Sequence, residues 1–352
     1  MLLVLIMAAA IWFGGRMIGA PREVRTTLLG LLYVAVLAIQ ITLPENNPLR
    51  LATGGSAALW LIFGGFVALL LGYRAVLFRL RQRVRGDDTA SVTAPQKGSA
   101  FSETELNRYA RHIVLREIGG AGQKALKEAK VLVIGAGGLG APVLQYLAAA
   151  GVGTIGVIDD DKVENANLQR QVIHTDAAIG MPKVFSAQQR MEAQNPFVTV
   201  RPYNRRLTDE IAEDLVGDYD LVLDGTDNFD TRYLVNRACA AKGVPLISGA
   251  LSQWEGQLSI FDPASGAPCY QCVFPQAPAA HLAPSCAEAG VLGPLPGVIG
   301  AMMAVEAVKL ITGAGTPARG QMMIYDALFG ESRTIAVAPR ADCPVCGDIS
   351  KG

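Results

Sequence analysis

The pattern of hydrophobic and polar positions divides the 352-residue chain into two parts that meet near residue 100. Three apolar stretches without a charged side chain, at 1–15, 26–44 and 51–73, precede that point. A helix needs about 20 apolar residues to cross a bilayer, so the third stretch is the strongest candidate, the second is adequate and the first is marginal. We predict about three transmembrane helices, with residues 1–85 forming a membrane anchor. A signal peptide is the alternative for the first stretch, but no basic leader precedes its apolar run.

The arginines around these stretches predict the orientation of the anchor. Arg16, Arg22 and Arg25 flank the first connection, and only Arg50 with Glu45 marks the second. Cytoplasmic loops carry an excess of basic residues. We therefore expect a multi-pass inner (plasma) membrane protein with its N-terminus outside, its remaining chain in the cytoplasm and anionic membrane lipid near the basic run. That run follows the third stretch and contains Arg74, Arg79, Arg81, Arg83 and Arg85.

Residues 86–100 are rich in Gly, Asp, Ser, Thr, Pro and Lys, which is typical of a flexible linker. Beyond them, short apolar runs alternate with helical segments. The run 131–134 predicts a buried strand, and 141–150 predicts a helix. The glycine-rich turn 135–140 joins the two, as in a dinucleotide fold, where phosphate approaches the backbone at a helix N-terminus. The pattern predicts an α/β, Rossmann-like nucleotide-binding fold with a mostly parallel sheet, although a tight turn without a ligand is an alternative.

Acidic and basic residues follow in the order that nucleotide chemistry requires. Asp159 ends a second apolar run about 20 residues after the glycines, where such folds place an acid on the ribose. Arg170 and Lys183 suit phosphate oxygens, and Asp227, in a polar loop after the strand near 220–224, suits Mg²⁺. These residues favour ATP over a nicotinamide cofactor. Solvated surface charge is the alternative for the two cations, and a helix N-cap is the alternative for Asp227.

Four of the six cysteines form two Cys-x-x-Cys pairs, which predict one structural zinc site. Disulfides or a redox pair are the alternatives. Of the two remaining cysteines, Cys239 lies in a helical pattern and Cys286 in a loop punctuated by proline and glycine. Cys286 is therefore the reactive candidate, with a non-catalytic loop thiol as its alternative. The predicted zinc ligands are Cys269, Cys272, Cys343 and Cys346.

From about residue 101 to 347 the chain resembles the MoeB/ThiF/HesA branch of the ubiquitin-activating enzyme family. The resemblance rests on several separated motifs, which make chance agreement a poor explanation. They are Arg108-Tyr109-Ala110-Arg111, the glycine turn, Asn167-Leu168-Gln169-Arg170-Gln171, Lys183, Asp227-Asn228, Ser285-Cys286-Ala287-Glu288-Ala289-Gly290 and the paired cysteines.

The resemblance implies an adenylyltransferase that uses ATP, Mg²⁺ and Zn²⁺ and activates the C-terminal glycine of a ubiquitin-like sulfur carrier ending in Gly-Gly. It implies a homodimer in which Arg111 reaches the phosphates of the neighbouring subunit. Family members commonly have a polar residue and a glutamine around that arginine, whereas this chain has Ala110 and His112. In relatives with thiol chemistry, a cysteine at the position of Cys286 can link to the carrier. The implied ATP-binding residues are Gly138, Asp159, Ala166, Asn167, Leu168, Gln169, Arg170, Lys183, Asp227 and Asn228.

Within this branch, the small subunit of molybdopterin synthase is the expected carrier, because the chain carries no appended rhodanese segment. Carriers of the thiamine or cysteine pathways are the alternatives. A nicotinamide- or flavin-binding oxidoreductase and a catalytically silent membrane scaffold are the alternatives from other classes. The formal net charge is zero, which argues against a nucleic-acid partner, and the hydrophobic fraction of 51% reflects the membrane segment.

Overall fold

The computed structural model describes residues 2–17, 19–86, 100–278 and 289–348. The chain forms two compact units, residues 1–92 and 93–352. The segment 87–99, which contains most of the predicted linker, lies outside the described residues.

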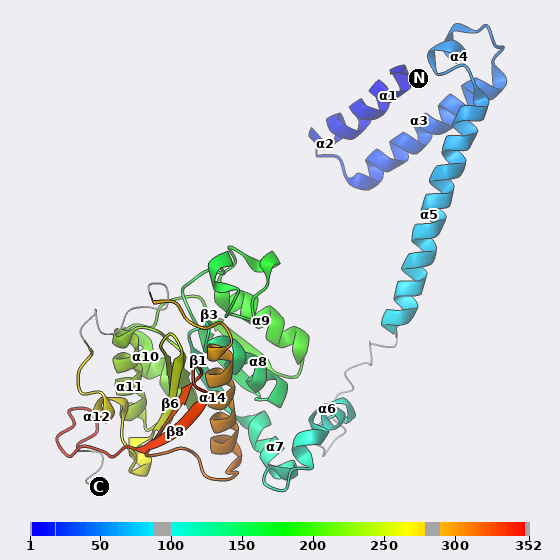
Figure 1. The fold of residues 1–352 in the computed structure, drawn as a ribbon. Coiled ribbons are helices and arrows are strands. Elements are labelled where there is room, and N and C mark those ends of the chain that lie inside the picture. Colours follow the sequence, from blue (N-terminus) through cyan, green and yellow to red (C-terminus); the bar gives the residue numbers. More distant parts are fainter. Residues whose placement is uncertain (1, 18, 87–99, 279–288, 349–352) are drawn as a thin grey trace. The chain divides into compact units, whose positions relative to one another are not determined.

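The N-terminal unit is helical (Figure 1). Its two long helices, α3 (Arg22–Thr42) and α5 (Ala57–Gly86), contain apolar windows at Glu23–Thr42 and Ala57–Arg74 that are long enough to cross a membrane. The apolar helix at Leu3–Met17 is shorter. Two of the three predicted spans therefore have the required length and composition, and the first does not. The short elements are α1 (Leu2–Ala9), a π-helical turn (Ala10–Gly14), α2 (Gly15–Met17) and α4 (Pro48–Ala52).

A chain of hydrogen bonds joins the two long helices of this unit. Tyr33 on α3 donates to the backbone oxygen of Trp60 on α5 (2.8 Å), and the Trp60 indole donates to the oxygen of Thr53 (3.0 Å). Gln40 is buried and donates to the Thr53 hydroxyl (2.8 Å). Gly64 permits this approach, because a Cβ at that position would overlap the Tyr33 ring. The two helices therefore pack in one specific register.

The second unit is built on one eight-stranded sheet in the order β3-β2-β1-β4-β5-β6-β7-β8. The strands from β3 to β5 are parallel, and β6 to β8 extend the sheet in antiparallel fashion. This arrangement confirms the predicted α/β fold with a mostly parallel sheet. The strands are β1 (Lys130–Ile134), β2 (Thr154–Ile158), β3 (Thr199–Tyr203), β4 (Leu221–Asp224), β5 (Leu246–Leu251), β6 (Glu255–Phe261), β7 (Gln321–Asp326) and β8 (Glu331–Ala336).

Helices cover both faces of the sheet (Figure 1), and alternate residues of β1 serve the two cores. Val131 and Val133 face the core that contains α8 (Gly140–Ala150), α9 (Lys183–Gln194) and α14 (Leu295–Thr312). Leu132 and Ile134 face the core that contains α10 (Asp209–Gly217) and α11 (Phe229–Lys242). Both faces are apolar, as expected for strands buried on each side.

Helix α14 is long and apolar enough to meet the criteria for a membrane span. Its residues Ile299, Met303 and Ala307 are nevertheless buried in the core against the sheet. Its hydrophobic character is therefore explained by packing within the second unit.

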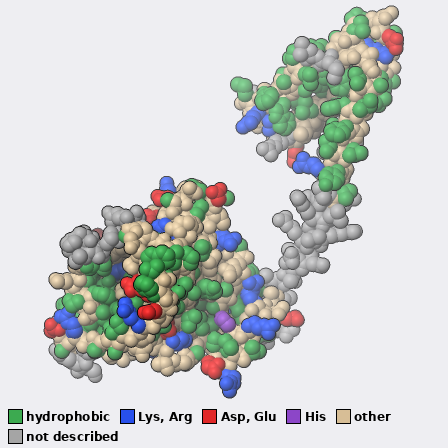
Figure 2. All heavy atoms as spheres, in the orientation of Figure 1, with side chains coloured by type: hydrophobic (Ala, Val, Ile, Leu, Met, Phe, Trp, Pro, Cys, Tyr) green, Lys and Arg blue, Asp and Glu red, His purple; other side chains and the backbone are tan. Residues whose placement is uncertain are grey.

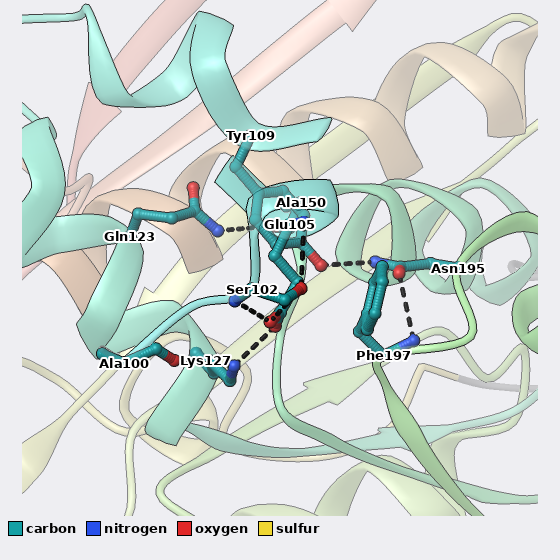
Figure 3. A network of polar contacts seen from close by, with 9 residues as sticks. All are labelled: Ala100, Ser102, Glu105, Tyr109, Gln123, Lys127, Ala150, Asn195 and Phe197. Carbon is teal, nitrogen blue, oxygen red and sulfur yellow. Dashed lines mark hydrogen bonds and ion pairs between the residues drawn. The ribbon is translucent and has the colours of Figure 1, made fainter. Parts of the chain in front are cut away.

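A buried polar network fixes α6 (Glu103–Ile113) beside α7 (Gly119–Glu128) (Figure 3). Ser102 and Glu105 form a capping box at the start of α6, and the Glu105 carboxylate also accepts a hydrogen bond from Lys127 of α7. Farther along α6, the Tyr109 hydroxyl accepts a hydrogen bond from Asn195 (2.8 Å). The rotation of α6 about its axis is thereby set.

This network predicts an acid-sensitive contribution to stability. Burial raises the pKa of the Glu105 carboxyl, but the hydrogen bonds from Lys127 and Ser102 outweigh it and hold the pKa below the ordinary value of 4.5. Because the folded-state pKa is depressed, the contribution is fully present above the ordinary value and is lost as pH falls through the folded-state pKa.

We expect Glu105→Gln to lower the free energy of unfolding near pH 7 by about 1–3 kcal/mol. The gap to the unaltered protein should close at acidic pH. Urea titrations of both proteins across this range measure the gap. An equal difference in the free energy of unfolding at neutral and acidic pH would contradict this role of Glu105. Glu103→Gln is the control, because Glu103 is an exposed residue of the same helix.

Candidate functional site

A cavity of about 910 Å³ lies at the carboxyl ends of the parallel strands. The strand order reverses between β1 and β4, and ligands of open α/β sheets bind at such a switch point. Gly138 from the turn after β1, Asp159 after β2 and Asp227 after β4 all line the cavity. Three residues that follow different strands, and that are far apart in the sequence, therefore line the same cavity.

The glycine turn has the backbone geometry that only glycine supplies. Gly135 has φ of +91°, and a Cβ on Gly140 would lie 1.9 Å from the Gly135 oxygen. The turn is tied to the neighbouring strand, because the Ala136 amide donates to the Asp159 carboxylate (2.7 Å).

His174 supports the same turn from beneath, and the sequence analysis missed it. Its Nε2 lies 2.9 Å from the Ala136 oxygen and its Nδ1 lies 2.9 Å from the Ser186 hydroxyl. Burial lowers the pKa of His174, which favours the neutral ring. A carbonyl only accepts, so Nε2 carries the proton and donates to Ala136 while Nδ1 accepts from Ser186.

Asp159 and Lys183 are two charged residues that line the cavity. Burial raises the pKa of the Asp159 carboxyl, and this effect exceeds the opposing effects of Lys183 and of the Ala136 and Asp161 amides. Lys183 begins α9, is 4% exposed, and its ammonium lies 2.8 Å from the Asp161 carboxylate. A buried ammonium that faces a cavity with one exposed carboxylate partner suits an anionic ligand.

Arg170 lines the cavity, while the residues just before it play a supporting part. The Arg170 guanidinium donates to the Asn167 side chain (2.8 Å) and to the Ala166 oxygen (3.4 Å). Gln171, which also lines the cavity, is 4% exposed and its Oε1 has no partner among the described residues. Of the predicted ATP-binding residues, six line the cavity, namely Gly138, Asp159, Arg170, Lys183, Asp227 and Asn228, whereas Ala166, Asn167, Leu168 and Gln169 are not among its lining residues.

The loop after β4 presents Asp227 as an unengaged carboxylate. Asn228, rather than Asp227, caps α11, because its side chain accepts from the Thr231 amide (2.9 Å). The exposed Asp227 carboxylate makes no hydrogen bond or ion pair within the described part of the chain. An unpaired carboxylate in a cavity that Lys183 and Arg170 also line fits a hard cation bound together with phosphate oxygens.

Arg232 shapes this loop from below, and the sequence analysis missed it as well. Arg232 is 5% exposed, and its guanidinium donates to the oxygens of Thr226 and Gly249 (the latter at 2.8 Å) and lies 3.9 Å from the Asp224 carboxylate. Asp224 in turn accepts from the Thr226 amide (2.9 Å) and hydroxyl (2.7 Å). The sequence offered one indication of this role, because Arg232 is a charged residue on the face of α11 that is otherwise buried.

One predicted catalytic residue lies away from the cavity of its own chain, and another lies outside the described residues. Arg111 is exposed on α6 and does not line the cavity of its own chain. Cys286 lies outside the described residues, because the segment 279–288 is not described. Cys239 is buried in α11, and burial together with the nearby Asp224 raises the pKa of its thiol, so it is not a reactive thiol.

The four paired cysteines come together in a buried cluster. All four Sγ atoms lie within 4.8 Å of one another, with separations of 3.5 Å (Cys269 to Cys343), 3.3 Å (Cys272 to Cys346) and 3.9 Å (Cys269 to Cys272). Four sulfurs at about 2.3 Å from one tetrahedral Zn²⁺ lie about 3.8 Å apart. None of these four cysteines is paired in a disulfide, so the cluster fits a zinc ion and not the alternative of disulfides.

Comparison with known proteins identifies the family. The ThiF family model matches residues 109–345. The chain is 49% identical to the sulfur carrier protein adenylyltransferase of Thermus thermophilus over 70% of this chain and 93% of that protein. It is 46% identical to the SAMP-activating enzyme E1 of Haloferax volcanii over 71% of this chain and 92% of that protein. The adenylyltransferase and sulfurtransferase MOCS3 of Bos taurus is 47% identical, with 71% of this chain and 55% of that protein covered.

Solved structures agree on the fold. PaaA has a TM-score of 0.60 and 24% identity, with 74% of this chain and 82% of that chain covered. Escherichia coli MccB with ATP has a TM-score of 0.60 and 24% identity, with 71% and 76% covered. The glycine turn, the strand-end charges and the sequence relatives agree: the chain belongs to the ThiF family and, like its relatives from Thermus thermophilus and Bos taurus, is an adenylyltransferase.

Proposed function

We propose that residues 101–352 form an adenylation domain that uses ATP to activate the C-terminal glycine of a ubiquitin-like sulfur carrier ending in Gly-Gly, with release of pyrophosphate. The observation that carries the proposal is the cavity at the switch point of the sheet. It combines the glycine turn with Asp159, Arg170, Lys183 and Asp227. The names of the relatives from Thermus thermophilus and Haloferax volcanii support the reaction class.

Each cavity residue has a role in this proposal. The turn that contains Gly138 receives the phosphates, because it leads into the N-terminus of α8, where backbone N–H groups bind anions. A side chain at Gly138 would also crowd Pro296, at 3.2 Å. Asp159 binds the ribose hydroxyls. Arg170 and Lys183 neutralise charge on the phosphates, and Asp227 holds Mg²⁺, which when bound offsets the phosphate charge. Ala166, Asn167, Leu168 and Gln169 shape the segment that presents Arg170, and Asn228 positions Asp227 by capping α11.

The reaction requires no general base, because the carrier carboxylate is ionised near neutral pH. The carboxylate attacks the α-phosphate in line, and the bond between the α-phosphate and the pyrophosphate breaks. The protein therefore acts by positioning and charge neutralisation. Arg111 acts on the cavity of a second protomer in the proposed homodimer, which accords with its position away from its own cavity.

The small subunit of molybdopterin synthase is the proposed carrier, and carriers of the thiamine and cysteine pathways are the competing outcomes. The test is ATP–pyrophosphate exchange by the full chain in detergent with each carrier in turn. Exchange that depends on one carrier and is lost when its Gly-Gly end is removed supports the proposal and selects the pathway. A folded, zinc-loaded protein that exchanges with none of them would refute it.

We further propose that α3 and α5 anchor the enzyme in the inner (plasma) membrane, with membrane lipid as the partner. Their large apolar side chains face outward in the N-terminal unit, where Leu31, Ile62 and Leu69 are exposed by 61%, 68% and 69%. Hydrophobic side chains predominate over charged ones on its visible face (Figure 2). Such a surface suits lipid. The arginines after Tyr73 favour a cytoplasmic catalytic domain.

The full chain is expected in the membrane fraction after alkaline carbonate washing. Protease added to intact spheroplasts should leave the catalytic domain uncut, and protease added after lysis should cut it. Replacing Leu31, Ile62 and Leu69 together with lysine should release the protein. The same change at Leu106, Leu328 and Phe329, which are exposed residues of the second unit, should not. Recovery of the unaltered chain in the washed supernatant would rule out the anchor.

A further inference from the structure

Helix α11 carries two buried polar side chains on one face. Arg232 is 5% exposed and Asn236, one turn later, is 1% exposed. Residues four apart share a helix face, so both side chains project into the protein rather than into solvent. Polar groups at this depth are retained only where partners satisfy them.

Asn236 uses both ends of its amide on the loop that carries the first cysteine pair. Its Oδ1 accepts from the Tyr270 amide (2.7 Å), and its Nδ2 lies 3.7 Å from the Cys269 sulfur and donates to it. An N–H that points at a metal-bound thiolate stabilises the charge on sulfur and fixes the direction of the ligand.

From the same face of α11, Arg232 donates to the Thr226 oxygen in the loop after β4 and to the Gly249 oxygen in the neighbouring strand β5. The cysteine cluster and the loop that presents Asp227 are therefore held by neighbouring turns of one helix. The segment 270–274 completes the connection, because Tyr270 and Phe274 line the cavity while Cys269 and Cys272 belong to the cluster. The Tyr233 hydroxyl of α11 also donates to the Phe274 oxygen (2.9 Å).

We propose that Asn236 is a positioning residue that couples the metal cluster to the nucleotide site. Through Cys269 and Tyr270 it holds the loop of the first cysteine pair against α11, and α11 holds the loop that contains Asp227 through Arg232. Metal occupancy therefore sets the geometry of the nucleotide cavity in addition to joining the end of the chain to the domain. The nucleotide half of this inference rests on the proposed function, whereas the metal half does not.

Two variants of Asn236 separate its contacts. Asn236→Asp keeps the acceptor for the Tyr270 amide but replaces the N–H donor with a carboxylate oxygen, and Asn236→Leu removes both contacts at similar volume. Arg237→Ala is the matched control, since Arg237 is the next residue of α11 and forms an exposed ion pair with Asp209.

The first measurement is metal binding by the full chain in detergent. We expect both Asn236 variants to lose Zn²⁺ to a competing chelator with about 10- to 100-fold weaker affinity. In the Co²⁺-substituted protein, the sulfur-to-metal charge-transfer band should shift in Asn236→Asp and stay fixed in Arg237→Ala. Unchanged metal affinity and an unchanged band in a folded Asn236→Asp protein would overturn the role of Asn236.

The second measurement is ATP affinity by calorimetry with zinc-saturated and zinc-stripped protein. Coupling predicts several-fold weaker ATP binding in the stripped protein and in zinc-loaded Asn236→Asp, with Arg237→Ala unaffected. Equal ATP affinity in a variant with weakened metal binding would overturn the coupling. Failure of the zinc-loaded unaltered protein to bind ATP would instead contradict the proposed function, and the metal measurements would still decide the role of Asn236.

Discussion

Replacing Asp227 with alanine is expected to lower carrier-dependent ATP–pyrophosphate exchange about 100- to 1000-fold. The carboxylate is the unengaged acid of the cavity that Arg170 and Lys183 also line, and its loss removes the proposed Mg²⁺ ligand where negative charge develops. The effect should fall on kcat at saturating ATP. Thermal unfolding should change little, because Asp227 is exposed and Asn228 caps the helix.

Asp230→Ala is the control for charge in the Asp227 experiment. Asp230 is an exposed acid in the first turn of the same helix and does not line the cavity. Exchange by Asp230→Ala should stay within about twofold of the unaltered protein, since an exposed charge outside the cavity is screened by water and salt. Near-normal exchange by a folded Asp227→Ala protein would refute the proposal that Asp227 is a Mg²⁺ ligand.

The residues that were predicted from sequence share a local signature. The glycine turn and Asp159 follow directly after an apolar run, and Asp227 lies in the short polar loop after another; a parallel sheet gathers the carboxyl ends of its strands at one edge. The Cys-x-x-Cys spacing likewise carries its own chemistry. In these cases the pattern along the chain already implies the arrangement in space.

The supporting residues lack such a signature. His174, Arg232 and Asn236 act through contacts with segments that are distant in sequence, such as the Ala136 oxygen and the Cys269 sulfur. Nothing near them in sequence identifies those partners. Hydropathy has the same limit, because α14 meets the length and composition of a membrane span but packs in the core.

Replacing Arg232 with methionine is expected to impair both folding and exchange. The side chain lies 3.9 Å from the buried Asp224 carboxylate and donates to the oxygens of Thr226 and Gly249. Methionine fills a similar volume but leaves Asp224 without its cation, and breaking a buried pair in this way costs about 3–5 kcal/mol. Chemical denaturation of the full chain in detergent measures the loss, and Arg237→Ala, which breaks an exposed pair, should cost at most about 1 kcal/mol.

A second substitution in the Arg232→Met protein distinguishes stability from positioning. Asp224→Asn removes the buried charge and should restore part of the free energy of unfolding. Asp224→Asn does not replace the guanidinium N–H groups that donate to the Thr226 and Gly249 oxygens. The loop that contains Asp227 therefore still lacks its contact with residue 232, and exchange should remain low. Recovery of exchange together with stability would show that Arg232 acts only by balancing the charge of Asp224. Recovery of the free energy of unfolding without recovery of exchange would show that the Arg232 guanidinium positions the loop that contains Asp227.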